Sequence, residues 1–354
     1  MDMKSYVTPL SDSTWSVLSE TAKTTFDYDY AAGREKLLNL YQKGKDLQWD
    51  SGRRIDWNRE IDITNPLGVP DSFIPIYGSR TWDRLNDAEK ANVRRHMTAW
   101  QFSQFLHGEQ GALVCTAKIV QTVPMIDSKF YAATQVMDEA RHVEAYRRLL
   151  KEKFRFVYPI APPLKRLLEQ ALTDKRWDFT YLGMQVLIEG LALAAFQRIR
   201  DYAKNPLCQA VNAYVMQDEA RHVAFGRIAL REYYPQLSAA ERREREQFVI
   251  EGSYFLRDRL NSEEMWEAIG IDPKDAMAAH AASEGQVRFR KRLFSRIVPT
   301  VKDIGLWSEP VQKAYAEMGV LHYAERNAQE MLDHDAAVAE EFDKLLAARA
   351  SPSA

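Results

Sequence analysis

The chain has 354 residues, 46% of them hydrophobic, which is enough to bury the core of one large domain or two small ones. Its formal net charge of -2 excludes a general electrostatic attraction to polyanions, so we expect neither nucleic acid nor a membrane as a partner. Only two cysteines occur, Cys115 and Cys208, which argues against a disulfide framework and against a thiolate metal site.

Residues 1–84 are predicted to be an irregular segment that wraps around the main body of the protein. Their first stretch, MDMKSYVTPLSDSTW, has no apolar core of signal-peptide length, so we expect a cytoplasmic protein. Pro66, Pro70 and Pro75 interrupt the pattern, and residues 33–45 form one of its short helical patches.

Long amphipathic helices are predicted from residue 85 onwards, where apolar residues recur at three- and four-residue spacing with few breakers. We place them at about 86–122, 127–153, 177–203, 207–233 and 239–260. Residues 85–260 thus form a helical bundle, and residues 261–354 add two or three accessory helices to the same structural domain. No strand pattern competes, so the predicted class is all-α.

The most apolar run of the sequence is TYLGMQVLIEGLALAAF, residues 180–196. It is short for a bilayer, and Glu189 near its centre would be penalised in lipid. We therefore interpret it as a buried helix of a soluble protein.

An internal repeat is the most informative feature of the sequence. The six residues from Asp138 to Val143, DEARHV, recur without change from Asp218 to Val223. A further glutamate precedes the glutamate of each copy by thirty residues, Glu109 in the first half and Glu189 in the second. The two halves therefore agree in motif and in spacing.

The spacing predicts that each pair of glutamates is level across a helical hairpin. Residues equidistant from the turn between two antiparallel helices lie side by side, and the midpoints fall at Pro124 and Lys204, where turn residues occur. Within each motif, glutamate and histidine are three residues apart and share one helical face. Two such hairpins would form a four-helix bundle with six inward groups: Glu109, Glu139, His142, Glu189, Glu219 and His222.

The residues around these groups are apolar, so we expect the groups to be buried. Around Glu109, the positions three and four residues away are Phe105, Leu106, Ala112 and Leu113. Four neighbouring buried carboxylates would repel one another, but two divalent cations would balance their charge. Carboxylate oxygens with one imidazole per metal suit iron or manganese, and the lack of thiolates argues against structural zinc.

The residues beside the ligands also have an expected role, because a metal-bound imidazole usually donates its other N–H to a carboxylate. Asp138 and Asp218 are candidates for this role, and each could serve the histidine of the other half. Arg141 and Arg221 could pair with these aspartates or orient the ligand carboxylates.

These residues resemble the ferritin-like di-iron carboxylate proteins, whose four-helix bundle supplies two lone glutamates and two Glu-x-x-His motifs. The resemblance covers about residues 85–235. It implies a bundle that binds two irons, or a manganese and an iron, accepts electrons from a donor such as a ferredoxin or a flavin reductase, and activates dioxygen. A homodimer is expected by the same analogy.

Particular relatives match less well. The bacterial multicomponent hydroxylases share the Asp-Glu-x-Arg-His form but carry a threonine where this chain has Leu193. The arylamine N-oxygenases are similar in size and in using one polypeptide, but they add a third histidine at the position of Val215, so a close match to them is not expected. Tyr146 occupies the position of the radical tyrosine in the small subunit of ribonucleotide reductase, and we expect a pocket tyrosine there, with a redox role as the alternative.

The sequence therefore predicts an enzyme that uses dioxygen to oxidise a small organic substrate, either free or bound to a carrier, by hydroxylation, N-oxygenation or desaturation. Two alternatives remain open. One is an iron-handling ferroxidase or storage protein, which would normally have about half this length, and the other is a subunit that stores a radical.

Overall fold

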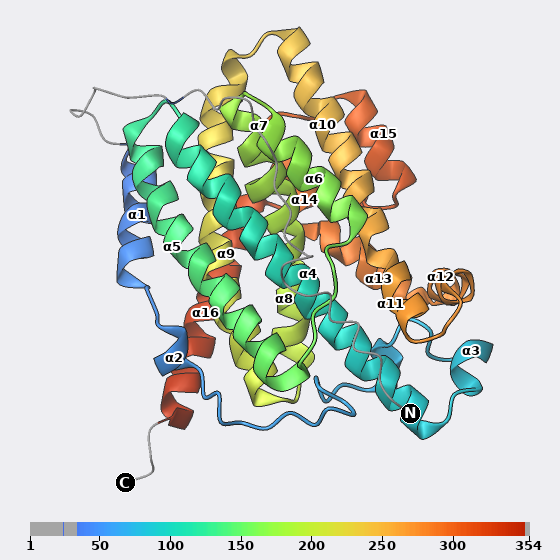
Figure 1. Cartoon of the computed structure of the whole chain (residues 1–354). Coiled ribbons are helices and arrows are strands. Elements are labelled where there is room, and N and C mark those ends of the chain that lie inside the picture. The colour runs from blue at the N-terminus through green and yellow to red at the C-terminus, as the bar shows by residue number, and fades with distance from the viewer. Residues whose placement is uncertain (1–23, 25–33, 351–354) are drawn as a thin grey trace.

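A long four-helix bundle forms the centre of the computed structural model, which describes residue 24 and residues 34–350 (Figure 1). The bundle consists of α4 (Asp87–Thr122), α5 (Ile126–Leu149), a third helix continuous over Trp177–Tyr202, and α9 (Pro206–Tyr233). Helices α4 and α5 pack against each other as one hairpin, and the third helix packs against α9 as the second. No strand occurs in the described residues, so the all-α prediction is confirmed.

Local sequence explains where the bundle helices begin. Asn86 and Glu89 form a reciprocal capping box at the start of α4. At the start of α9, the side chain of Asn205 accepts hydrogen bonds from two backbone N–H groups, and Pro206 occupies the first helical position. The turns of the two hairpins are residues 123–125 and 203–205, so the predicted midpoints lie within them.

The third bundle helix changes its winding just before the second half-site. It comprises α7 (Trp177–Tyr181), the π-helical segment η3 (Leu182–Ile188) and α8 (Glu189–Tyr202). A π-helical turn widens a helix and shifts the side chains that follow it, and such turns occur mostly at functional sites. The helix is apolar and long enough to span a membrane, but 94% of its apolar window is buried inside the protein.

Further helices surround the bundle. Helix α1 (Glu35–Asp46) packs on α5 and α9, and α16 (Ala328–Ala350) packs on α9, whereas α6 (Pro162–Thr173) and α10 (Ala239–Asp258) cover η3 (Figure 1). The shorter helices are α2 (Ser51–Arg54), α3 (Arg80–Asp83), α11 (Glu263–Ala268), α12 (Pro273–Ala282), α13 (Glu284–Arg292), α14 (Ile297–Asp303) and α15 (Glu309–Glu317). A π-helical segment, η2 (Leu150–Phe154), ends α5, and 3-10 turns occupy Asp71–Phe73, Tyr234–Gln236, Arg259–Asn261, Leu293–Ser295 and Leu321–Glu325.

Two expectations about the helices were wrong. Helix α6 was not predicted, because its two leading prolines resemble a breaker, although proline is compatible with a first helical turn. The region after residue 261 contains six helices rather than two or three. Gly270, Gly305 and Gly319 adopt positive φ angles between them, and these reversals divide the region into short helices. In the N-terminal segment, residues 1–23 and 25–33 lie outside the described residues.

The close approach of α9 to η3 gives a test of the packing. A Cβ atom built on Gly226 would lie 2.4 Å from Cβ of Gln185, and neither atom is the flexible end of a side chain. We expect Gly226→Ala to lower the free energy of unfolding by about 1–3 kcal/mol, as overpacking does, when measured by urea denaturation. Gly285→Ala, a helical position with no atom within 4 Å of the added carbon, is the matched control and should leave stability unchanged or raise it.

Candidate metal centre

The bundle brings the six candidate ligands together in its interior. Helix α4 carries Glu109, α5 carries Glu139 and His142, the start of α8 carries Glu189, and α9 carries Glu219 and His222. Each hairpin supplies two glutamates and one histidine, as the repeat predicted. All six residues are no more than 5% exposed, so the cluster is shielded from solvent.

The candidate ligand atoms form two overlapping groups. The first comprises Glu109, Glu139, His142 and Glu219, and the second comprises Glu139, Glu189 and His222, with the ligand atoms of each group within 4.8 Å of one another. Nδ1 of His142 lies 3.1 Å from Glu109 and 3.4 Å from both Glu139 and Glu219. Nδ1 of His222 lies 3.1 Å from the other oxygen of Glu139. Glu139 therefore faces both groups.

The chemistry of this cluster fits two divalent metal ions. Five of its buried atoms have no hydrogen-bond partner in the described residues: Oε2 of Glu139, Oε2 of Glu189, both carboxylate oxygens of Glu219, and Nδ1 of His222. Buried polar atoms are seldom left without a partner, because desolvation is costly. Carboxylate oxygens and imidazole nitrogens directed at a common point are the ligands that such ions prefer.

The electrostatics of the cluster without metal indicate the same need for positive charge. Burial raises the pKa of Glu109 and of Glu189 well above the ordinary range, and the nearby Glu219 carboxylate adds to both shifts. Burial also acts to raise the pKa of Glu139, but the two imidazole rings outweigh it and hold that pKa below its ordinary value. Burial would lower the pKa of His142 and of His222, but their carboxylate neighbours raise both instead.

Each histidine is held by an aspartate from the other half of the repeat. Nε2 of His142, the nitrogen that faces away from the glutamates, lies 3.0 Å from Asp218, and Nε2 of His222 lies 3.3 Å from Asp138. An N–H donated to a carboxylate at this nitrogen makes Nδ1 the nitrogen that binds metal, once any proton on it has been displaced. The crossed pairing also ties the two hairpins together.

Two arginines neutralise the two aspartates. Arg141 donates to Asp138 and, at 3.0 Å, to Asp218, and Arg221 donates to Asp218. With these four charges balanced, the four glutamates are left for the metal ions. Asp218 is stabilised as a carboxylate, because Arg221 and His142 lower its pKa in spite of its burial.

Three residues that donate hydrogen bonds to the site were not predicted from the sequence. Gln48 donates to Asp138 at 2.8 Å, and Trp49 donates its indole N–H to Asp218 at 2.8 Å. Gln135, one turn before Glu139, donates to Glu139 at 3.0 Å and to Glu189 at 2.9 Å. Gln135 could have been found from its position on the ligand face of α5, whereas no local pattern marks Gln48 or Trp49.

Tyr146 and two other polar residues of the bundle region lie outside the cluster. Tyr146 is fully buried and donates its hydroxyl to Asn212 at 2.9 Å. His107 contacts the backbone oxygen of Tyr158 at 2.8 Å, so it points away from the ligands. Glu251 is exposed and accepts a hydrogen bond from Gln247, its neighbour one turn earlier.

Two neighbouring cavities, which share part of their lining, lie on one side of the cluster. The inner one, of about 30 Å³, is lined by Glu109, Glu189 and Glu219 together with apolar residues of α4, η3 and α8. The outer one, of about 120 Å³, shares Gln104, Phe105, Leu191 and Arg259 with it and extends towards α13. These shared side chains separate the metal centre from the outer cavity.

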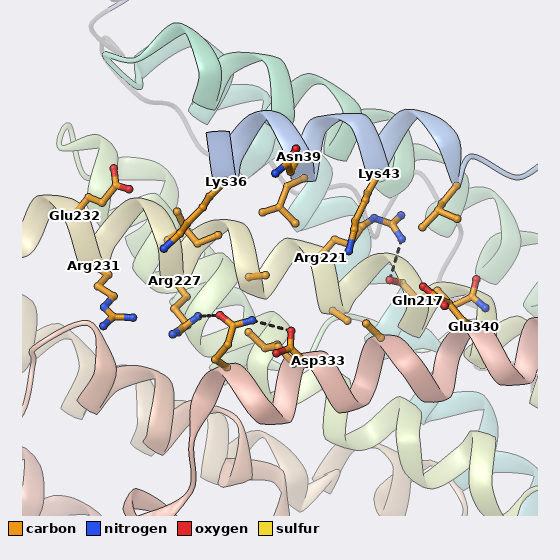
Figure 2. Close-up of a pocket in the computed structure, with 18 residues that line it drawn as sticks. Lys36, Asn39, Lys43, Gln217, Arg221, Arg227, Arg231, Glu232, Asp333 and Glu340 are labelled. Carbon is orange, nitrogen blue, oxygen red and sulfur yellow. Dashed lines mark hydrogen bonds between the residues drawn. The ribbon is translucent and has the colours of Figure 1, made fainter. Parts of the chain in front are cut away.

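A separate hollow of about 760 Å³ lies between α1, α9 and α16 (Figure 2). Lys36 and Lys43 of α1 and Arg227 and Arg231 of α9 line it, and none of the six candidate ligands does. Arg221 connects it to the site, because its guanidinium group bonds to Asp218. This hollow therefore lies behind the aspartates, away from the cavities that reach the glutamates.

A helical bundle that encloses two Glu/His groups between paired hairpins defines a di-metal carboxylate protein of the ferritin-like class. Residues 31–305 match the family model described as "P-aminobenzoate N-oxygenase AurF". The match spans well over half of the chain, so the chain belongs to this family. It is an oxidoreductase that activates dioxygen at a di-metal site and oxidises a small organic molecule.

Several solved structures are similar to this chain. A Synechococcus protein with aldehyde deformylating oxidase activity shares 17% sequence identity at a TM-score of 0.45, covering 62% of this chain and 94% of that one. The R2-like ligand-binding oxidase with aerobically reconstituted metal cofactor after photoconversion shares 16% identity at a TM-score of 0.44, covering 90% and 94%. Comparison with curated proteins gave no significant match.

The expectation that the chain is not a close match to the arylamine N-oxygenases was wrong. It rested on Val215, which is fully buried and contributes no ligand atom. The prediction gave this one position too much weight. The family match extends from the N-terminal segment to α14, and the Glu/His groups form without a third histidine.

Replacing the two glutamates between the histidines should abolish metal binding. We expect about two metal ions per chain after anaerobic reconstitution, measured by plasma mass spectrometry, and far fewer in a Glu139→Ala, Glu219→Ala double variant, since an ion would lose carboxylates from both groups. Glu251→Ala, which removes an exposed carboxylate, is the control and should keep full loading. Full loading of the double variant would contradict the assignment.

Metal binding should release protons. Glu109, Glu189 and the two histidines have raised pKa values, so metal ions must displace protons from them at pH values where the free side chains would already have lost theirs. The apparent metal affinity should therefore increase with pH. The raised pKa values also mean that the folded metal-free protein binds more protons than the unfolded chain does. The metal-free protein should therefore lose stability as the pH rises above the ordinary pKa of glutamate. Titration calorimetry in two buffers of different ionisation enthalpy measures the release, and its absence would refute the prediction.

Proposed function

We propose that the protein is a di-iron N-oxygenase that oxidises the amino group of an aromatic amine. The observation that carries this proposal is the one-sided access to the cluster: Glu109, Glu189 and Glu219 border a small cavity whose other walls include Phe105 and Phe196. A flat ring would suit such walls, and the name of the family supports an arylamine as substrate.

We assign one iron to Glu109, Glu139 and His142 and the other to Glu189, Glu219 and His222, with Glu139 and Glu219 between them. Glu139 supports this assignment because it belongs to both groups, and Glu219 approaches both histidines, at 3.4 Å and 3.6 Å. When bound and reduced, the two ions supply the electrons and the Lewis acidity that activate dioxygen. A mixed manganese and iron pair is the alternative outcome of a metal analysis, since carboxylates and imidazole suit both.

The other residues of the site orient the metal ligands and keep water away from the metal centre. Asp138 and Asp218 keep each imidazole in the orientation that directs Nδ1 inwards. Ile188 and Leu191 in the cavity wall exclude water, which favours transfer of oxygen to the substrate over loss of oxidant to solvent. Tyr146 has a structural role in this proposal, since its hydroxyl is bonded to Asn212.

An external electron donor, such as a ferredoxin or a flavin reductase, belongs to the proposal. Each N-hydroxylation consumes one dioxygen, two electrons and two protons and releases one water, and the buried irons must be reduced again before the next cycle. We also propose a cytoplasmic homodimer. Val114, Phe130 and Met137 support a dimer, because they expose apolar surface on the outer sides of α4 and α5.

The proposal is tested by supplying the reduced holoenzyme with 4-aminobenzoate or with an unsubstituted aniline under ¹⁸O₂. We expect a hydroxylamine or more oxidised nitrogen product that carries ¹⁸O, detected by mass spectrometry. Glu251→Ala should retain this activity and the Glu139→Ala, Glu219→Ala variant should lose it. A product hydroxylated on the ring or a side chain, with the nitrogen intact, would rule out N-oxygenation as the reaction.

A further inference from the structure

The hollow between α1, α9 and α16 has the size of a small-molecule site, although it supplies none of the candidate metal ligands. Its volume of about 760 Å³ lies in the range of pockets that hold drug-sized ligands. It shares no lining residue with the two cavities beside the glutamates. A molecule bound here would therefore leave the substrate side of the cluster free.

The walls of the hollow are apolar on all three helices. They include Leu40 of α1, Ala224 and Ile228 of α9, and Leu332 of α16. Small-molecule sites are mostly apolar in this way, with a few polar groups that fix the orientation of the ligand. Such walls suit a flat heteroaromatic ring system.

Two lysines of α1 bring positive charge to the hollow. Lys36 and Lys43 are exposed and reach from α1 towards α9 (Figure 2). They lie seven residues apart, which is two helical turns and about 10 Å along the axis. In the part of the chain that the structure describes, neither lysine has an ion pair or a side-chain hydrogen bond. Both ammonium groups are therefore available to an anionic ligand.

The other charges of the hollow are paired or belong to another helix. Arg227 and Arg231 both approach Asp303, at 2.7 Å and 3.6 Å. Glu232 pairs with Arg34 at 3.1 Å. The two remaining acids stand on α16, away from α1, and are Asp333 and Glu340 (Figure 2). The negative group of a ligand is therefore directed to the lysines of α1.

Arg221 joins the wall of the hollow to the metal centre. Its guanidinium group donates to Asp218, whose carboxylate lies 3.0 Å from Nε2 of His142. Two hydrogen-bonded side chains thus lead from the hollow to a candidate metal ligand. Electron tunnelling weakens steeply with distance, so a short hydrogen-bonded path of this kind suits electron transfer into a buried centre.

We propose that the hollow binds a reduced phosphorylated flavin, which delivers electrons to the metal centre from the side away from the substrate cavities. The ring contacts the apolar walls, one lysine of α1 binds the phosphate, and the other faces the anionic edge of the reduced ring. The anionic flavin hydroquinone gives one electron to each of two ferric ions, releases one proton to solvent and leaves as the oxidised flavin. The inference rests on the proposed function in its need for an external electron donor.

Binding is tested with flavin mononucleotide and riboflavin, which differ by the phosphate. Fluorescence titration of the oxidised flavins with the metal-loaded protein measures affinity without turnover. We expect the wild-type protein to bind flavin mononucleotide on the order of 10- to 100-fold more tightly than riboflavin, the usual effect of charge-assisted hydrogen bonds. A Lys36→Gln, Lys43→Gln double variant should lose this preference. Ala224→Trp, which fills the hollow, should weaken the binding of both flavins.

A matched control removes the same charge elsewhere. Lys274 of α12 and Lys313 of α15 are exposed and do not line the hollow. A Lys274→Gln, Lys313→Gln double variant should therefore bind both flavins as the wild-type protein does.

Electron delivery is tested by mixing the oxidised metal-loaded protein with reduced flavin mononucleotide in the absence of oxygen. Stopped-flow absorption follows the oxidation of the flavin. The rate should approach a maximum as the flavin concentration rises in the wild-type protein and in the lysine control, because the flavin binds before it reacts. In Ala224→Trp the reaction should be slower and its rate should stay proportional to flavin concentration, as for transfer on collision.

The inference is overturned if the wild-type protein binds the two flavins equally or if the preference survives the loss of Lys36 and Lys43. It is also overturned if reduced flavin does not bind but a ferredoxin reduces the centre and the same lysine variant weakens that reaction, since the surface would then receive an acidic protein. These measurements use no organic substrate. A failure of 4-aminobenzoate to be oxidised at nitrogen would therefore leave flavin binding intact, and a failure of flavin binding would leave N-oxygenation to be supported by another donor.

Discussion

Four carboxylates buried in an apolar bundle are the constraint on which this structure depends. Four negative charges in such a place would repel one another, and only two divalent ions or several bound protons can compensate for them. The chain solves the rest of the charge problem itself, since Asp138 and Asp218 are neutralised by Arg141 and Arg221. The glutamates and the imidazole nitrogens therefore remain available to metal, and the folded state is coupled to metal binding.

The bundle and the cluster of six groups could be predicted because both follow from local rules. Helical periodicity locates the long helices, and equal distances from two turns bring Glu109 level with Glu139 and Glu189 level with Glu219. Contacts that join distant segments leave no such mark in a sequence. The hydrogen bond from Trp49 to Asp218 spans 169 residues, and no sequence pattern near Trp49 predicts it. Lys36 and Lys43 are likewise ordinary lysines in the sequence, and only the hollow that they line sets them apart.

The structure divides its tasks between the repeat and the segments outside it. The two hairpins supply every candidate ligand and the aspartates that orient the histidines. The outer cavity, in contrast, takes much of its wall from other parts of the chain, including Phe73 before the bundle and Arg259 and Phe289 after it. A common centre for oxygen chemistry can thus be combined with different binding surfaces, so the substrate must be inferred from the additions rather than from the motif.

The crossed contacts of the aspartates impose an order on the maturation of the chain. During synthesis the N-terminal segment emerges first, yet Trp49 cannot reach its acceptor until α9 has left the ribosome and turned back along the bundle. His142 also depends on α9, because Asp218 is the hydrogen-bond partner of its Nε2 atom. The first hairpin alone therefore lacks the aspartate that orients His142 and the ligands of the second half, and its apolar face is uncovered. Metal insertion must then be a late event, and a ribosome that stalls between the two hairpins leaves a nascent chain prone to aggregate.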